Sequence, residues 1–271
     1  MANRIFPVQK MQPDLDGFRV EVNAEAARAD IVLDRPSFNL ISMIQREQLS
    51  AVFDMLDKDS TIQVIVVRAA GEHFSRGSDV EEWVETSPRQ LSRLAWTLSA
   101  PSRCSKPVIS ANRGYCFGAG FELALACDFR IVTETTLYAL PAQAEASLAG
   151  PARLLRTMVG VGRAKDIVMR SRYIRGAQAY DWGIATEFVV DSELESATDS
   201  LVKELQTLSS PAQRAAKRVL NEIEEAPPLL GAENKEPGRR SDDCHRRFSE
   251  EGDALNHKRS AFFMDKDNAA A

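Results

Sequence analysis

The hydrophobic and polar positions of this chain predict β-strands that alternate with helices. Residues 18–22 alternate apolar and polar side chains, and residues 29–33 form a matching run, so the two predict an antiparallel hairpin. Residues 62–69 and 107–111 are short runs suited to buried parallel strands, and residues 129–132 repeat the pattern. Strands separated by helices favour parallel pairing, so the pattern indicates an α/β fold.

Helical spacing predicts the elements between and after these strands. The clearest helix covers residues 44–56, where Ile44, Leu49, Val52, Phe53 and Leu56 form the expected apolar stripe. A short strand is expected at 187–190. Further helices are expected at residues 81–96, from 121 onward, and at 164–169, 176–182, 194–208, 210–223 and 242–263.

Composition excludes several classes of protein. The 271 residues are 44% hydrophobic and 27% charged, which is ordinary for a globular chain that buries a sizeable core. A net charge of −5 gives no basis for binding nucleic acid or an acidic membrane surface. No apolar run approaches a membrane span, and the first residues lack a signal-peptide core, so we expect a cytosolic protein.

The cysteines and histidines do not suggest a metal site or a nucleophile. Cys104, Cys116, Cys127 and Cys244 lack the spacing of metal ligands, and the three histidines lie far apart in sequence. We expect Cys116 and Cys127 to be small apolar fillers of the core.

The most informative stretch is the glycine-rich segment at residues 112–128. Gly114, Gly118 and Gly120 lie between the strand at 107–111 and an apolar run from Phe121. Glycines there allow backbone to approach a ligand closely, and the first N–H groups of a helix favour developing negative charge. Glu122 lies in that same turn, where a carboxylate either transfers protons next to a stabilised oxyanion or simply complements the helix dipole. The glycine spacing does not fit a dinucleotide-binding turn.

Two sequence motifs resemble one known family. Residues 111–124 read ANRGYCFGAGFELA and resemble the signature of the crotonase superfamily, the enoyl-CoA hydratase/isomerase fold. Residues 74–80, FSRGSDV, resemble the upstream F-x-x-G-x-D-[LIV] segment of that family, and the resemblance extends over about residues 19–263. It implies an α/β fold with a crotonase-like ββα spiral core and a C-terminal helical trimerisation region. We therefore predict a loosely ordered lead-in at 1–17, the core at 18–205 and the helical region at 206–271.

The resemblance also implies a catalytic site. The backbone N–H groups of Ser78 and Ala119 would bind the thioester oxygen of an acyl-CoA, with Glu122 as general acid/base. Hydratases of the family carry a second glutamate in an F-x-x-P-E segment, but residues 138–142 read YALPA here, so Ala142 replaces it. Glu145, three residues further on, either enters the pocket in its place or faces solvent.

Two basic residues complete the predicted site. Arg76 stands where a small residue is common in the family, and it either pairs with a carboxylate of the substrate or of Glu145 or is a solvated surface residue. Lys258 matches a basic residue that meets the CoA phosphates from a neighbouring subunit. The resemblance implies no cofactor beyond the coenzyme A of the substrate, and a homotrimer or a dimer of trimers.

Three functions remain open at this point. The first is an enoyl-CoA hydratase/isomerase-type enzyme that works through a thioester enolate. The second is a C–C bond or thioester hydrolase on the same fold. The third is a CoA-thioester-binding protein with little catalysis, which the alanine at position 142 favours.

Overall fold

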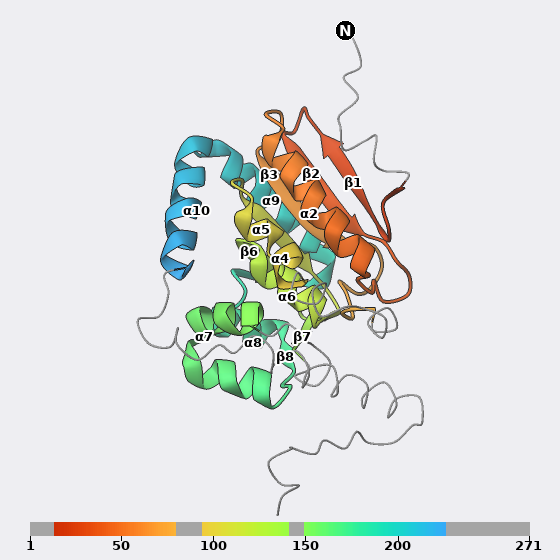
Figure 1. The fold of residues 1–271 in the computed structure, drawn as a ribbon, viewed down its shortest axis with the longest axis vertical. Helices are drawn as coiled ribbons and strands as arrows, with labels where there is room; N and C mark the ends of the chain where they lie inside the picture. Colours follow the sequence, from red (N-terminus) through yellow and green to blue (C-terminus); the bar gives the residue numbers. More distant parts are fainter. Residues whose placement is uncertain (1–13, 80–93, 141–148, 226–271) are drawn as a thin grey trace, which may run out of the picture.

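Two β-sheets with helices on both faces of the larger one make up the described part of the chain. The computed structural model describes residues 14–79, 94–140 and 149–225 (Figure 1). The predicted α/β class is confirmed, and parallel pairing dominates the larger sheet.

The larger sheet has six strands in the order β1-β2-β3-β4-β6-β9. Its strands are β1 (Phe18–Asn23), β2 (Arg28–Leu33), β3 (Val64–Ala69), β4 (Val108–Asn112), β6 (Phe129–Thr133) and β9 (Glu187–Val189). β1 and β2 form the predicted antiparallel hairpin, in which Phe18 pairs with Leu33. The other neighbouring strands are parallel, so their carboxyl ends lie at one edge of the sheet. Every residue of β4 is buried, as expected for a central parallel strand.

A smaller sheet continues from that edge. It contains β5 (Tyr115–Phe117), β7 (Leu137–Ala139) and β8 (Ile174–Arg175), with β5 and β7 parallel. The chain passes twice through the same sequence of elements: β4–β5–α6 and then β6–β7–α7. Here α6 is Ala119–Ala126 and α7 is Ala149–Met169. This repeat is the ββα turn that the family resemblance implies.

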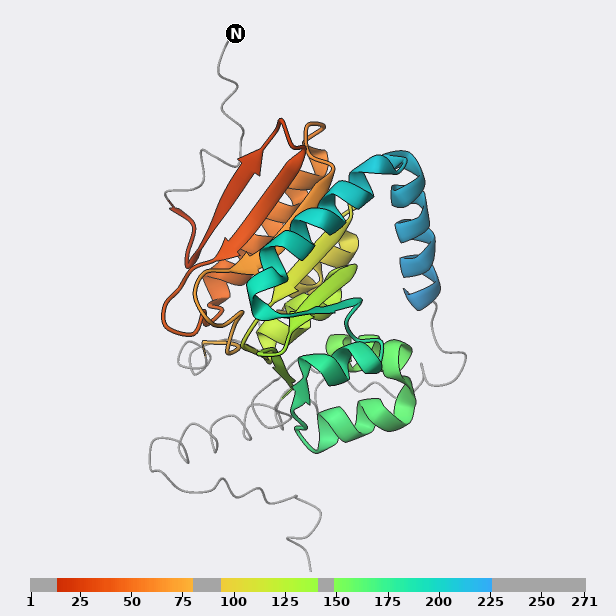
Figure 2. The same ribbon diagram turned by 180° about the vertical axis from the view of Figure 1, so that it is seen from behind.

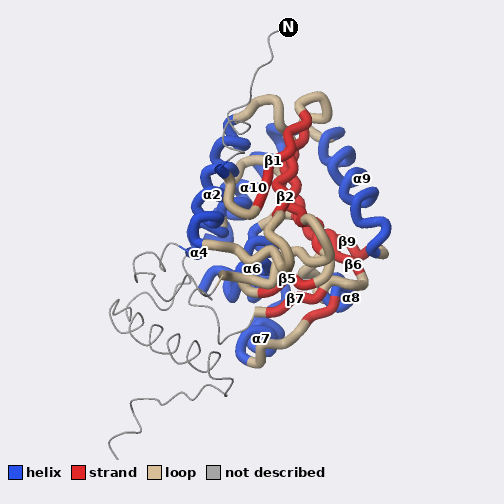
Figure 3. Tube along the Cα trace, turned by 90° about the vertical axis from the view of Figure 1, so that its right-hand side faces the viewer, coloured by secondary structure: helices blue, strands red, loops and turns tan. Residues whose placement is uncertain are grey.

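Helices cover both faces of the large sheet. On one face lie α2 (Met43–Lys58), α4 (Leu94–Leu98) and α6 (Figure 3), together with α5 (Ala100–Arg103), which is labelled beside them in Figure 1. On the other face α9 (Leu194–Thr207) crosses the strands (Figure 2). Its leucines belong to the same buried cluster as Val64, Ile109 and Ile131. The other α-helices of the described residues are α8 (Gly176–Asp181) and α10 (Ser210–Glu225), and a short 3-10 helix, η3 (Asp191–Glu193), precedes α9.

The predicted apolar stripe of α2 is wrong at its first position. Ile44 is 62% exposed, whereas Gln45 and Arg46 are buried in line with Leu49 and Val52. The first turn of α2 faces polar backbone: the side-chain amide of Gln45 donates to the carbonyl oxygen of Gly17 at 3.2 Å. Polar side chains therefore occupy the inner face at this end of the helix, because they have partners there.

The helix predicted at residues 164–169 is much longer than expected. α7 begins at Ala149 and is interrupted at Gly160, whose φ of 76° is not helical. Glycine and proline at positions 150, 151, 160 and 162 lower the helix propensity of this segment, so the sequence pattern does not predict its first turns. The predicted helices at 194–208 and 210–223 are confirmed as α9 and α10. Most of the helix predicted at 81–96, and the whole of the one at 242–263, lie outside the described residues.

Candidate active site

The segment that carries Ser78 lies between two other backbone segments. On one side the N–H of Ser75 donates to Tyr115 O, and the N–H of Phe117 donates to Ser75 O, both at 2.9 Å. On the other side the N–H of Ile41 donates to Gly77 O at 2.8 Å, and the N–H of Asp79 donates to Ile41 O at 3.0 Å. Hydrogen bonds on both edges fix this loop against the start of α2 and against β5.

This pairing sets the direction of the Ser78 amide. Ile41 and Ser78 form a parallel bridge in which Ile41 bonds to the residues on either side of Ser78. In parallel pairing of this kind, the N–H of the middle residue points away from the partner strand. The Ser78 amide therefore faces away from Ile41, toward the edge on which Phe117 lies.

Gly77 shows how closely the two loops approach each other. Its φ is 114°, and a Cβ added there would lie 3.3 Å from Phe117 O and 3.9 Å from Ala119 N. Ala119 is the first residue of α6, and the first N–H groups of a helix point out of its N-terminal end. The predicted pair, Ser78 and Ala119, is thus brought together across Gly77.

Glycine is also required on the α6 side of this junction. A Cβ at Gly120 would lie 2.7 Å from Ser75 Cβ, closer than real side-chain carbons approach. Ser75 in turn donates its hydroxyl to Asn39 O at 2.7 Å and accepts the N–H of Gly77 at 3.1 Å. The absence of a side chain at position 120 therefore seats α6 directly on the loop that carries Ser78.

Glu122 lies one turn into α6, as predicted. Its side chain is 4% exposed, and its backbone N–H donates to Gly118 O at 2.8 Å. A carboxylate near the N-terminus of a helix is stabilised by the helix dipole. The structure places this buried acid on the same short helix as Ala119 and Gly120, whose N-terminal end meets the Ser78 loop.

Arg76 is exposed, on the outer side of the loop. Its backbone N–H donates to Phe38 O at 2.8 Å, and its guanidinium carbon lies 5.0 Å from the centre of the Phe38 ring. Within the described residues it forms no ion pair, so its predicted pairing with a carboxylate stays a prediction. From Phe38 a row of stacked rings continues across the loops through His73, Tyr115 and Phe117.

Three predicted positions lie outside the described residues. They are Ala142, Glu145 and Lys258. Whether Glu145 replaces the missing second glutamate, and whether Lys258 meets the CoA phosphates, therefore stay predictions.

The described cysteines are core residues, as expected for Cys116 and Cys127. Cys116 is 0% exposed and Cys127 is 4% exposed. Burial raises the pKa of the Cys116 thiol well above its usual value, and it raises the pKa of Cys104 and Cys127 to about 12. These thiols stay protonated near neutral pH, so they are poor nucleophiles.

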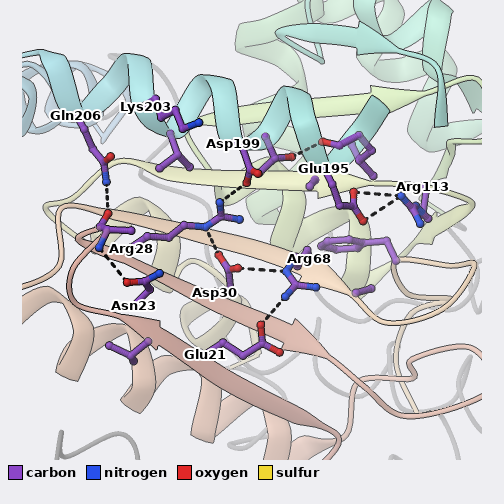
Figure 4. A pocket seen from close by; sticks show the side chains of 18 residues that line it. Glu21, Asn23, Arg28, Asp30, Arg68, Arg113, Glu195, Asp199, Lys203 and Gln206 are labelled. Carbon is purple, nitrogen blue, oxygen red and sulfur yellow. Dashed lines mark hydrogen bonds and ion pairs between the residues drawn. The ribbon is translucent and has the colours of Figure 1, made fainter. Parts of the chain in front are cut away.

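A second polar region lies on the opposite face of the sheet, between α9 and strands β1–β3. It is a cleft of about 590 Å³ crossed by ion pairs (Figure 4). Arg28 contacts Asp30 at 2.6 Å and Asp199 at 2.5 Å, while Arg68 contacts Glu21 at 2.6 Å and Asp30 at 3.3 Å. No local sequence pattern indicates this cleft, because Arg28 and Asp199 are 171 positions apart.

The described residues contain neither a helix suited to cross a membrane nor a cluster of metal ligands. None of the helices there is both long and apolar enough to cross a membrane. No group of three or more histidine, cysteine or acidic side chains in the same part of the chain is arranged to bind a metal ion.

Comparisons with known proteins agree on one family. A family model described as enoyl-CoA hydratase/isomerase matches residues 23–236. Carnitinyl-CoA dehydratase of Escherichia coli is 30% identical over 211 residues, covering 73% of this chain and 78% of that protein. Mevalonyl-coenzyme A hydratase of Aspergillus fumigatus is 28% identical over 174 residues, covering 60% of this chain and 63% of that protein.

Solved structures show the same fold. The crystal structure of an enoyl-CoA hydratase/carnithine racemase from Magnetospirillum magneticum superposes with a TM-score of 0.71 at 23% identity. The superposition covers 92% of this chain and 96% of that one, which supports the crotonase fold for the described residues.

Proposed function

Because the chain belongs to the enoyl-CoA hydratase/isomerase family, we propose that it processes an acyl-CoA thioester through an enolate. The N–H groups of Ser78 and Ala119 bind the thioester oxygen, and Glu122 moves the proton. The observation that carries this proposal is the junction at Gly77, where the Ser78 loop meets the N-terminus of α6. The buried carboxylate of Glu122 on the same helix supports it.

The chemistry follows from where charge develops. Glu122 takes a proton from Cα, the C–H electrons form a C=C bond, and the carbonyl π electrons move to the thioester oxygen. Two fixed N–H donors stabilise that oxygen, and in comparable sites the loss of one donor costs about 3–4 kcal/mol of transition-state stabilisation. Returning the proton to a different carbon then gives an isomerised thioester.

One carboxylate is enough for such a proton relocation. Hydration by the two-carboxylate route needs a second acid to hold the water, and position 142 is alanine. Isomerisation, or decarboxylation of a malonyl-type thioester, therefore fits this residue set better. The same alanine also favours a different function, that of a CoA-thioester-binding protein of low activity.

The test is a panel of acyl-CoA thioesters with the wild-type chain and Glu122→Gln. We expect double-bond movement, hydration or decarboxylation without CoA hydrolysis, and about 10²–10⁴-fold slower turnover in the variant with acyl-CoA binding retained. Glu195→Gln, in the cleft on the other face, is the matched control and should keep wild-type turnover. Full activity of Glu122→Gln would rule out the proposed mechanism. Hydrolytic release of CoA would indicate a hydrolase, and binding without turnover a binding protein.

We also propose that the chain assembles as a homotrimer or a dimer of trimers. Large apolar side chains are exposed around α7, β8 and α8, where a partner would cover them. They are Val161, Met169, Tyr173 and Tyr180.

A further inference from the structure

Arg46 is the most unusual buried charge close to the proposed site. It lies in the first turn of α2, is 1% exposed, and is among the largest fully buried side chains. Its neighbours on the inner face of α2, Leu49, Val52 and Phe53, are apolar core residues. Arginine is rarely buried so completely, because removing a charge from water is costly unless it gains strong partners.

The guanidinium of Arg46 contacts the loop of the proposed oxyanion site directly. Its Nη2 donates to the hydroxyl oxygen of Ser78 at 2.6 Å, a short distance for such a bond. Position 78 lies between the two backbone hydrogen bonds that join Gly77 and Asp79 to Ile41, just before α2 begins. A buried side chain and the start of the same helix therefore both brace the residue whose amide is to bind the substrate.

Two effects on the substrate oxygen follow from this contact. The hydrogen bond restricts Ser78, so it limits rotation of the peptide group that carries the Ser78 N–H. The same contact holds the positive charge of Arg46 against residue 78 in a buried region, where a charge acts more strongly on nearby groups than it would in water. Both effects strengthen an oxyanion site that is built from backbone donors.

We propose that Arg46 is a positioning residue of the oxyanion site, acting through the Ser78 hydroxyl to fix and polarise the amide that binds the thioester oxygen. This inference rests on the proposed function. It gives a role to the side chain at position 78. If only the backbone N–H mattered, any residue would serve at this position. Arg46 itself does not touch the substrate.

The test uses a thioester whose absorption wavelength depends on the electric field at its carbonyl group. A dimethylaminocinnamoyl thioester of CoA absorbs at longer wavelength when its carbonyl is polarised. We expect a red shift on binding to the wild-type chain and a smaller one in Arg46→Met, with kcat roughly 10- to 100-fold lower on the best natural-type substrate. Arg46→Lys should fall between them, because it keeps the charge but loses the planar fork.

Two further variants separate this role from a general loss of structure. Ser78→Ala keeps the backbone N–H and should reduce the red shift as Arg46→Met does, and the double variant should add little more. Arg68→Met, in the ion-paired cleft, is the matched control and should leave the shift and kcat unchanged. A folded Arg46→Met with the wild-type shift and kcat would overturn the proposal. If that variant does not fold, an unchanged shift in Ser78→Ala would overturn it instead.

These results also distinguish the two proposals. A wild-type chain that does not shift the probe, or a Glu122→Gln variant that keeps full turnover, would defeat the proposed function and this inference with it. A normal shift in the wild type and an inactive Glu122→Gln, together with a normal Arg46→Met, would defeat only the role of Arg46.

Discussion

Two regions of this molecule hold arginine side chains in different surroundings. In the cleft under α9, Arg28 and Arg68 each contact two carboxylates and remain partly exposed. Burial lowers the pKa of Arg28, yet its hydrogen bonds to Asp30 and Asp199 outweigh burial and leave that pKa raised. At the junction of α2 with the Ser78 loop, Arg46 is buried and donates to a hydroxyl.

If Arg46 has the proposed role, charge is used for structure in the cleft and for function at the junction. In the cleft, the ion pair of Arg28 with Asp199 joins α9 to the sheet, and the ion pairs of Arg68 join β3 to β1 and β2. We infer that Arg46, whose buried guanidinium donates to the Ser78 hydroxyl, acts instead on the proposed oxyanion site through that contact. The comparison therefore predicts large effects on activity at the glycine-rich junction and small effects on stability in the cleft.

Gly120→Ala should produce the largest effect. The added methyl group would meet Ser75 Cβ at 2.7 Å, so α6 and the Ser78 loop must move apart. We expect a loss of about 1–3 kcal/mol in the free energy of unfolding. Turnover should fall by about 10²-fold or more, because small displacements of fixed donors are costly. Chemical denaturation and steady-state kinetics of the same preparation measure both.

Gly162→Ala is the matched control for that variant. Gly162 lies in α7 and is exposed, and a Cβ there meets nothing within 4 Å. The change should leave turnover unaltered and raise stability by up to about 1 kcal/mol, since alanine favours a helix over glycine. Equal losses of activity in both glycine variants would show that the junction is not special.

Arg68→Met should produce a much smaller effect, confined to stability. The ion pairs of Arg68 are partly exposed, so their loss should cost roughly 0.5–1 kcal/mol in the free energy of unfolding. The difference from wild type should shrink at high salt, which screens exposed pairs. Unfolding by denaturant at low and high ionic strength measures it, and a substantial fall in turnover would place the cleft in the active site.

The sequence predicts the strands better than it predicts the site. β1, β2, β3, β4 and β6 follow from alternation or β-branched runs, since local pattern decides them. The start of α7 does not follow from the sequence pattern, because its glycines and proline have low helix propensity. The pairing of the Ser78 loop with α6 came only from family resemblance, because contacts between distant segments leave no periodic signal.

The burial of Arg46 shows a second feature that hydrophobic periodicity does not predict. Positions 45 and 46 fall on the inner face of α2 at helical spacing from Leu49, whereas Ile44 does not. Hydrophobicity alone therefore selected the wrong residue. A charged side chain on a buried helical face was itself the available signal, because such a residue needs a specific partner.

The most direct test of the account is the position of the thioester oxygen in a crystal structure of Glu122→Gln with a bound acyl-CoA. The account predicts that this oxygen lies within about 2.7–3.1 Å of both the Ser78 and Ala119 nitrogens. The acyl Cα should lie within reach of the side chain at position 122. A thioester bound elsewhere, or an oxygen in contact with neither amide, would contradict the proposed chemistry.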